Sequence, residues 1–409
     1  MIYQNFTGGL WLSRRHIVML TERLPMFPGI RDLRLEYVDN GYDVYSLVTR
    51  CITQCPLLEC LWIIPTPATF FIDNDHDIPP SLSSTSQHHH HANVNMSFLR
   101  LRLDDEVDHS RLASVLRLCP NLTRLSITTY SNPDNTIFDL CPRLQYLEWN
   151  PRTEYFMLWP KETHHQHEGL QYLATTDTAL ATIPHNHNMI QALTIVDMSY
   201  DNEPETIRFL DTCRHVKEIM FDPLESIDIP RQVLPALSYL SRLNLSILDP
   251  DTADGLVDYF KNHATHITLE TLELNLPIQH SLTQVLEAMT LVTTLKHVEI
   301  SPACVDEESL QTYIMHAPQL EHLCIDHGPS ISLETFKILG ELSHLCVLSI
   351  ASYYNTEQVS GAGIKTLVDK KLSNQDFSLS IACKKIDDAS YVKYAQSKLG
   401  ERFSFIILD

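Results

Sequence analysis

The feature that most constrains this chain is an apolar phrase, Leu-x-x-Leu-x-Leu, that returns about every 27 residues. In the copy at Leu320, Leu323 and Ile325, the last two residues stand two positions apart, so a β-strand points both to one side. Apolar residues at helical spacing follow over residues 333–342, and the phrase then returns at Leu345. Because neither so short a strand nor a single helix can bury its apolar side alone, neighbouring copies must stack.

The phrase is found fifteen times, which makes the spacing far more informative than any single match. The copies begin at Ile30, Leu58, Phe98, Leu122, Leu144, Leu170, Ile190, Val216, Leu240, Leu269, Leu295, Leu320, Leu345 and Phe403, with a partial copy at Leu379 and Ile381. The third copy reads Phe98-Leu101-Leu103 and the last reads Phe403-Ile406-Leu408. The mean step, (403 − 30)/14 or about 27 residues, falls within the range of leucine-rich repeats. We therefore predict an α/β leucine-rich-repeat solenoid of about 15 repeats, a horseshoe with a parallel concave sheet and convex helices.

The same pattern predicts the domain organisation. Residues 30–409 form the solenoid, and residues 1–29 form an N-terminal cap or half-repeat over its open end. The step from Leu58 to Phe98 is longer than the others, and its excess holds Pro79-Pro80 and the run His88 to His91. We predict a disordered loop, inserted in one repeat, at about residues 66–95.

Charge and hydropathy limit the classes of binding partner and the cellular compartment that we expect. The formal net charge is −21, from 30 basic and 51 acidic side chains, so nucleic acid and membrane surfaces are poor partners. No signal peptide is visible, and no apolar run approaches the roughly 18 residues of a membrane span. These observations favour a cytoplasmic or nuclear protein, in which the ten cysteines are reduced.

Four copies of the phrase are preceded by a second, shorter one. These are Cys55-Pro56-Leu57-Leu58, Cys119-Pro120-Asn121-Leu122, Cys141-Pro142-Arg143-Leu144 and Ala317-Pro318-Gln319-Leu320. Cys-Pro-x-Leu-x-x-Leu-x-Leu resembles the cysteine-containing leucine-rich repeats of F-box proteins, and the irregular spacing is similar to that of fungal members. The resemblance implies substrate recognition for an SCF-type (cullin) ubiquitin ligase.

The F-box itself is not expected in this sequence. In that family an N-terminal F-box docks the adaptor of the ligase, and it opens with a leucine-proline phrase followed by an acidic residue. Here Leu24-Pro25 is followed by Met26-Phe27-Pro28, and the first strand begins at Ile30. An SCF adaptor would thus be a partner only if an F-box exists upstream. The alternative is a leucine-rich-repeat scaffold or regulator unrelated to ubiquitination, for example a small-GTPase regulator.

Patterns that carry catalysis are missing from the sequence. There is no phosphate-binding glycine loop, no Gly-x-Ser-x-Gly elbow and no Cys-x-x-Cys pair, so we expect neither an enzyme nor a cofactor. The histidines at 164, 165 and 167, and those at 88–91, are more typical of solvated loops than of a metal site. Cys213, Cys304 and Cys346 are interpreted as structural thiols.

The residues that alternate with the buried ones should face the concave side and bind a protein partner. From the second to the sixth strand, the candidates are Trp62, Ile64, Arg100, Arg102, Arg124, Tyr146, Glu148 and Tyr172. Their arginines suit an acidic or phosphorylated segment. A second surface, suited to a basic segment, consists of Glu273, His297, Glu299, His322 and Asp326. The competing interpretation is an ordinary solvated strand face, with Trp62 packed beneath the 66–95 loop.

Overall fold

The computed structural model describes most of the chain, in two compact units. The described residues are 10–12, 22–27, 29–37, 43–65, 92–103, 107–129, 131–150, 169–180, 182–183, 189–198, 200–247, 249–275, 283–301, 306–326, 330–352, 359–374 and 376–407. The first unit comprises residues 1–190 and the second residues 191–409, and each is described below by itself.

In the first unit, the described strands form one parallel sheet in sequence order. Every consecutive pair of strands is hydrogen-bonded in parallel. The strands are β1 (Leu10–Leu12), β2 (Asp32–Tyr37), β3 (Cys60–Pro65), β4 (Phe98–Arg102), β5 (Arg124–Thr128), β6 (Tyr146–Asn150) and β7 (Tyr172–Thr176).

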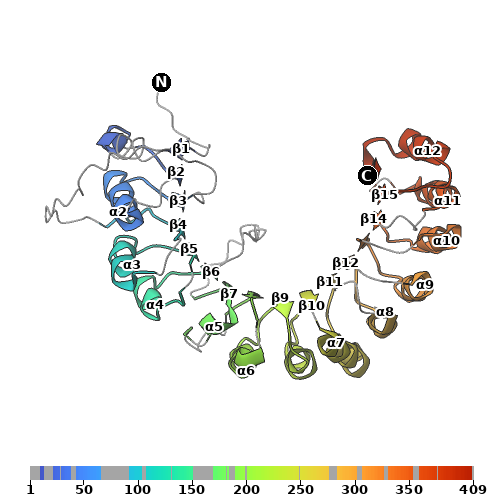
Figure 1. Ribbon diagram of the computed structural model, residues 1–409, viewed down its shortest axis with the longest axis horizontal. Coiled ribbons are helices and arrows are strands. Elements are labelled where there is room, and N and C mark those ends of the chain that lie inside the picture. Colours follow the sequence, from blue (N-terminus) through green and yellow to red (C-terminus); the bar gives the residue numbers. More distant parts are fainter. Residues whose placement is uncertain are drawn as a thin grey trace, which may run out of the picture. The chain divides into compact units, whose positions relative to one another are not determined.

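The second unit repeats this arrangement with a longer parallel sheet (Figure 1). Its described strands are β8 (Ala192–Val196), β9 (Glu218–Leu224), β10 (Arg242–Ile247), β11 (Thr271–Asn275), β12 (His297–Ser301), β13 (His322–Ile325), β14 (Val347–Ser352), β15 (Ser378–Cys383) and β16 (Phe403–Ile407).

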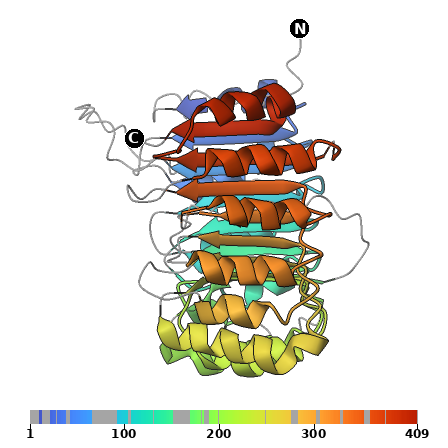
Figure 2. The same ribbon diagram turned by 90° about the vertical axis from the view of Figure 1, so that its right-hand side faces the viewer.

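Helices lie in most of the described connections between successive strands and cover one side of each sheet. The described helices of the first unit are η1 (Leu24–Met26), α2 (Val44–Gln54), α3 (His109–Leu116), α4 (Thr136–Leu140) and α5 (Asp177–Leu180). Those of the second are η3 (Tyr200–Asn202), α6 (Glu203–Thr212), η4 (Ile229–Val233), η5 (Leu234–Ala236), α7 (Pro250–His263), η6 (Ala264–His266), α8 (Thr283–Met289), α9 (Glu307–His316), α10 (Leu333–Glu341), α11 (Gly361–Lys371), α12 (Ser390–Leu399) and η7 (Gly400–Arg402). Figure 2 shows the later helices of the second unit stacked in one layer beside their strands. None of the described helices is long and apolar enough to cross a lipid bilayer.

The core lies between sheet and helices, and it is built from the repeated apolar phrase. Leu125 on β5, Leu243 on β10 and Leu323 on β13 are fully buried, and each pairs in register with the equivalent apolar residue of its neighbours. Since side chains alternate along a strand, the intervening residues point to the face that carries none of the described helices. We call this the open face. The predicted α/β leucine-rich-repeat solenoid, with a parallel sheet and helices on its other side, is confirmed.

Two of the predicted phrases are out of register. On β4, Leu99 and Leu101 pair with the buried Leu61 and Ile63, so Phe98 belongs to the open face rather than to the core phrase. The prediction was shifted by two residues, because Met96 is the buried first residue of this copy.

The last phrase is shifted by three residues. On β16, Phe403 and Phe405 pair with Leu379 and Ile381, so they take the positions predicted for Ile406 and Leu408. Ile406 is 54% exposed, which excludes it from the core.

The short cysteine-proline phrase forms the turn between helix and strand. The carbonyl oxygen of its first residue accepts a hydrogen bond from the backbone N–H three residues later, at Cys55–Leu58 (3.0 Å), Cys119–Leu122 (3.1 Å), Cys141–Leu144 (3.0 Å) and Ala317–Leu320 (3.1 Å). The three thiols are buried, and burial raises the pKa of Cys55 to about 11 and that of Cys119 and Cys141 to about 12. These cysteines are therefore packing residues, as small buried thiols usually are.

Two predictions on domain boundaries stay predictions. Strand β1 pairs in parallel with β2, so the sheet extends into residues 1–29, for which a cap or half-repeat is predicted. Most of the predicted inserted loop, residues 66–91, lies outside the described residues.

Candidate functional site

The open face of the first unit is organised in rows that cross the strands. One row contains Arg34, Trp62, Arg100, Ser126 and Glu148, each paired in register with the next. The adjacent row contains Cys60, Phe98, Arg124, Tyr146 and Tyr172. Because neighbouring parallel strands lie about 4.8 Å apart, side chains within a row touch although they are about one repeat apart in sequence.

Trp62 is the centre of a tight cluster, the Trp62 cluster, with Arg34, Phe98 and Arg100. The guanidinium carbon of Arg34 lies 4.5 Å from the indole centroid, and that of Arg100 lies 5.2 Å from it. The ring of Phe98 meets the indole edge-on at 4.8 Å and 88°. Cations over an aromatic face are attracted to it, so the indole holds both arginines over the sheet. Nη2 of Arg34 also donates a hydrogen bond of 3.4 Å to Oδ2 of Asp32.

Two further predicted arginines stand on the neighbouring strands. Arg124 on β5 pairs in the ladder with Phe98 and Tyr146, and Arg102 on β4 pairs with Thr128. Both side chains are half-buried, as is that of Arg100. The structure therefore places Trp62, Arg100, Arg102 and Arg124 on one face, on three consecutive strands.

Of the other predicted residues of this surface, Ile64 is half-buried, and the remaining three are buried. The rings of Tyr146 and Tyr172 stack in parallel at 4.1 Å and 6°, with only 5% and 7% of their surfaces exposed. Burial, followed by the nearby Tyr172 and Glu148, raises the pKa of Tyr146. Glu148 is 6% exposed, and its Oε2 accepts a hydrogen bond of 2.7 Å from the Ser126 hydroxyl. These three residues are therefore packed beside the arginines and are not exposed for contact with a partner.

Sequence reasoning missed two members of the Trp62 cluster. Arg34 stands at the same position of its phrase as Trp62 does, so extending the alternation to the first strand identifies it. Phe98 was assigned to the core because its phrase was read two residues out of register.

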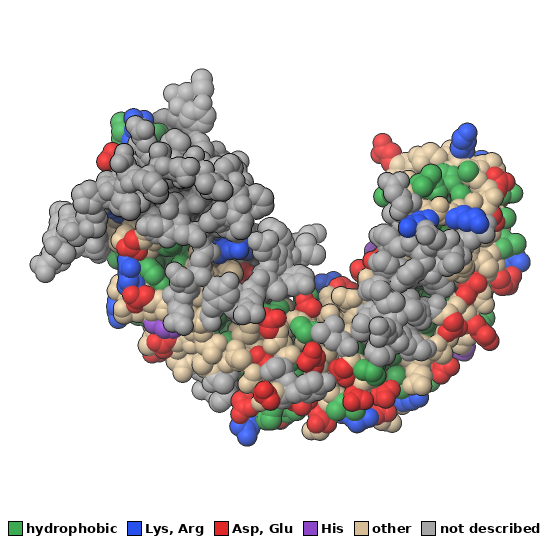
Figure 3. Space-filling view, in the orientation of Figure 1, with side chains coloured by type: hydrophobic (Ala, Val, Ile, Leu, Met, Phe, Trp, Pro, Cys, Tyr) green, Lys and Arg blue, Asp and Glu red, His purple; other side chains and the backbone are tan. Residues whose placement is uncertain are grey.

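In the second unit, two of the predicted acidic residues form a row on adjacent strands. Glu273 on β11 pairs in register with Glu299 on β12, and Glu273 accepts a hydrogen bond of 2.6 Å from the side-chain amide of Asn244. Burial raises the pKa of Glu299, and Glu273 and Asp326 raise it further. Asp326 accepts a hydrogen bond of 3.1 Å from Ser301. Figure 3 shows that Asp and Glu side chains are also spread along the flank of this unit, with Lys and Arg between them.

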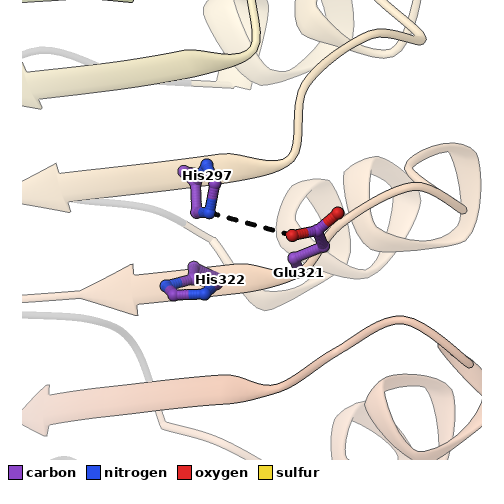
Figure 4. Close-up of side chains that lie close together, drawn as sticks. All are labelled: His297, Glu321 and His322. Atoms are coloured by element: carbon purple, nitrogen blue, oxygen red, sulfur yellow. Dashed lines mark ion pairs between the residues drawn. The ribbon is translucent and has the colours of Figure 1, made fainter.

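His297 and His322 belong to a different arrangement, shown in Figure 4. They pair in register on β12 and β13, and their ring centroids are 4.2 Å apart at 75°. Glu321, which was not predicted, comes directly before His322, and its Oε2 lies 4.0 Å from Nε2 of His297. Desolvation and the neighbouring His322 lower the pKa of His297, against the opposing effect of Glu321. We call these three residues the histidine site.

Other residues considered from sequence do not gather into a site in the described part of the chain. The histidines at 88–91, 164, 165 and 167 lie outside the described residues, and so does Cys304. Cys213 is fully buried, and Cys346 is half-buried with its thiol 3.2 Å from the carbonyl oxygen of His344. Cys213 therefore belongs to the core, in keeping with the structural role predicted for it.

Comparisons with known proteins find similarity at the level of structure alone. No protein-family model matches the sequence, and no curated protein matches it. An internalin (inlF) from Listeria monocytogenes is similar, with 14% identity, a TM-score of 0.42 and coverage of 78% of this chain and 82% of that one. A Bacteroides fragilis protein is 13% identical, with a TM-score of 0.36, covering 54% of this chain and 66% of that one. A Listeria monocytogenes internalin C2 is 11% identical, with a TM-score of 0.31 and coverage of 58% and 81%.

Proposed function

We propose that this protein is a non-catalytic recognition protein whose open face in the first unit binds a protein segment with acidic or phosphorylated side chains. The observation that carries the proposal is the Trp62 cluster, with Arg102 and Arg124 on the same face. In a chain of net charge −21, such a group of arginines favours a negatively charged ligand.

The geometry suits this ligand for two physical reasons. A guanidinium can donate two parallel hydrogen bonds to a carboxylate or phosphate, which gives both strength and orientation. Arg34 and Arg100 are already held against the indole, at 4.5 and 5.2 Å, so less conformational freedom is lost on binding. The half-buried indole adds an apolar contact of the kind found at the centre of protein interfaces.

A peptide array tests the proposal directly. The purified chain is applied to peptides of varied sequence, each present in unphosphorylated, phosphorylated and acidic-substituted forms. We expect binding to prefer the negatively charged forms and to fall about 10- to 150-fold in an Arg100→Glu/Arg124→Glu variant, since hydrogen bonds to charged groups contribute about 1.5–3 kcal/mol.

The matched control is Arg117→Glu/Arg143→Glu, which replaces two exposed arginines of the same unit, one at the end of α3 and one in a turn. It makes the same charge change away from the open face, so binding should stay within about twofold of the parent. Equal losses in both variants would indicate a general charge effect and would contradict the proposed surface.

The finer hypothesis is substrate recognition for a cullin ubiquitin ligase, and it is supported by the cysteine-proline phrase. Affinity purification from the native cell separates it from the alternative of a scaffold or regulator unrelated to ubiquitination. Cullin and its adaptor should co-purify under the first hypothesis. Their absence, with a partner still bound through the Trp62 cluster, would favour the second.

A further inference from the structure

We propose that His297, Glu321 and His322 bind a divalent transition-metal ion of the zinc class. One ligand atom from each residue lies within 4.8 Å of the others, and the Nε2–Oε2 distance between His297 and Glu321 is 4.0 Å. A tetrahedral zinc ion with bonds of about 2.0–2.1 Å places its ligand atoms roughly 3.4 Å apart. Side-chain rotations that move the ligand atoms by about 1 Å would therefore bring all three within bonding distance of one ion, with the backbone unchanged.

The backbone at all three residues is held by the sheet. The N–H groups of Glu321 and His322 both donate to the carbonyl oxygen of Lys296, at 2.8 and 2.9 Å. The N–H of His297 donates to the carbonyl oxygen of Glu270 at 3.0 Å. His297 and His322 stand on strands, and Glu321 directly precedes one. Ligands on rigid strands are positioned more accurately than ligands on loops, so little reorganisation of the backbone is needed on binding.

A neighbouring hydroxyl is placed to orient the first imidazole. Oγ1 of Thr271, which pairs in register with His297, lies 3.5 Å from Nδ1 of that ring. When the proton is on Nδ1, the Nδ1–H group donates a hydrogen bond to Oγ1 of Thr271, and the lone pair of Nε2 is directed toward Glu321. Metal-binding histidines are generally oriented in this way by a partner on their other nitrogen.

Nearby basic side chains have carboxylate partners of their own. Lys296 Nζ lies 2.9 Å from Glu270, and Arg242 lies 3.7 Å from Glu218. Glu321 also interacts electrostatically with Lys296, and its carboxylate lies next to the two imidazoles.

The ligand set also selects the metal and the state of the site. Two imidazoles and one carboxylate favour zinc-class ions over magnesium or calcium, which prefer oxygen ligands. His322 is exposed, so a fourth position stays open to water or to a side chain of a bound protein.

Calorimetric titration with Zn²⁺ tests the site, and Co²⁺ serves as a spectroscopic probe. Other histidines could bind the same ions, so the full-length background variant carries His88→Ser, His89→Ser, His90→Ser, His91→Ser, His164→Ser, His165→Ser and His167→Ser. In this background we expect one equivalent of Zn²⁺ to bind, and bound Co²⁺ to give the strong visible absorption of a four-coordinate ion.

Removing a ligand should weaken Zn²⁺ binding by at least about tenfold, because replacing even a residue that only contacts a metal ligand has an effect of this size. This applies to His297→Ala, His322→Ala and Glu321→Gln. Thr271→Val keeps all three ligands but removes the hydroxyl beside Nδ1 of His297, and it should lower the Zn²⁺ affinity about tenfold. His344→Ala removes an exposed histidine of the same unit and should leave the affinity unchanged.

Two results would overturn the proposal. One is an unchanged Zn²⁺ affinity in either His297→Ala or His322→Ala; the other is no Zn²⁺ binding in a background variant whose circular dichroism matches that of the parent. Because His322 is exposed, its replacement should not disturb packing, and this variant keeps the test decisive even if His297→Ala fails to fold.

Discussion

Two glycines on neighbouring helices of the second unit give a sharp test of the packing. Gly340 lies in α10 and Gly363 lies in α11. A Cβ added at Gly363 would lie 3.0 Å from Cγ and 3.1 Å from Cβ of Phe336, whose side chain is fully buried. A Cβ added at Gly340 would meet mainly Cδ of Lys370, at 2.6 Å, with its other neighbours at 3.5 Å or more. The same substitution therefore meets a fixed ring at one site and a movable side chain at the other.

The free energy of unfolding should fall in Gly363→Ala but not in Gly340→Ala. Replacing an interior helical glycine with alanine favours the helix by about 1 kcal/mol. Gly340 lies in the last turn of α10, where this gain is smaller, and the opposing cost is disturbance of the exposed ion pair between Lys370 and Glu341, which contributes little to stability, so Gly340→Ala should be neutral or slightly stabilising. At Gly363 the opposing cost is overpacking of about 1–3 kcal/mol, and the gain is smaller in the first turn, so Gly363→Ala should destabilise by about 1–2 kcal/mol.

Hydrogen exchange of the backbone amides in α10 and α11 is the suitable measurement, because long repeat arrays need not unfold in a single step. A difference of about 2 kcal/mol between the two variants corresponds to an exchange rate about 30-fold faster for Gly363→Ala. Equal exchange in the two variants, or greater protection in Gly363→Ala, would refute the close packing of these helices.

Three further outcomes follow from the described contacts. A double-mutant cycle of Tyr146→Ala and Tyr172→Ala in chemical denaturation should give a coupling energy of about 0.5–1.5 kcal/mol from the ring stack, and zero coupling would contradict the stack. Because burial raises the pKa of Cys119 and Cys141 to about 12, iodoacetamide at pH 8 should modify them only after unfolding, as followed by mass spectrometry. Folding raises the pKa of Glu299 above its ordinary 4.5, so the folded state binds this proton more tightly and loses stability as pH rises past that value; Glu299→Gln should therefore raise the melting temperature at pH 7 and leave it unchanged at pH 3.

The fold could be predicted from sequence because each further copy of the phrase at the same spacing is independent support for the repeat. The third copy shows where this fails. Both Met96-x-x-Leu99-x-Leu101 and Phe98-x-x-Leu101-x-Leu103 fit an apolar phrase, and sequence alone favours the aromatic residue. Pairing decides between them: the N–H of Phe98 donates to the carbonyl oxygen of Glu59, as the first residue of β5 does to Ser97.

The size of a register error determines its consequence for the site. On β4 the error was two residues, which preserves the side of the sheet, so Arg100 and Arg102 were still assigned to the open face. On β16 it was three residues, which exchanges the two faces, so the exposed Ile406 was placed in the core. The residues of the open face can thus be predicted from alternation even where the predicted register is wrong by an even number of residues.

Glu321 could not be found by alternation, because it precedes the strand and lies outside the set of open-face positions. It approaches His297 through the length of its own side chain, at 4.0 Å, and through the pairing of β12 with β13. Neither quantity is visible in the sequence, where Glu321 resembles any other polar residue after the first leucine of a phrase.

Chemistry in this chain is assembled across repeats rather than within them. Trp62 meets Arg34 and Arg100, and His297 meets His322, only because each strand is held in register with the next. A change of length in a connecting segment should leave such rows intact, whereas a one-residue shift within a strand would turn the row to the other face. Each proposed site also lies within a single unit, so substitutions in the Trp62 cluster should leave zinc binding at the histidine site unchanged.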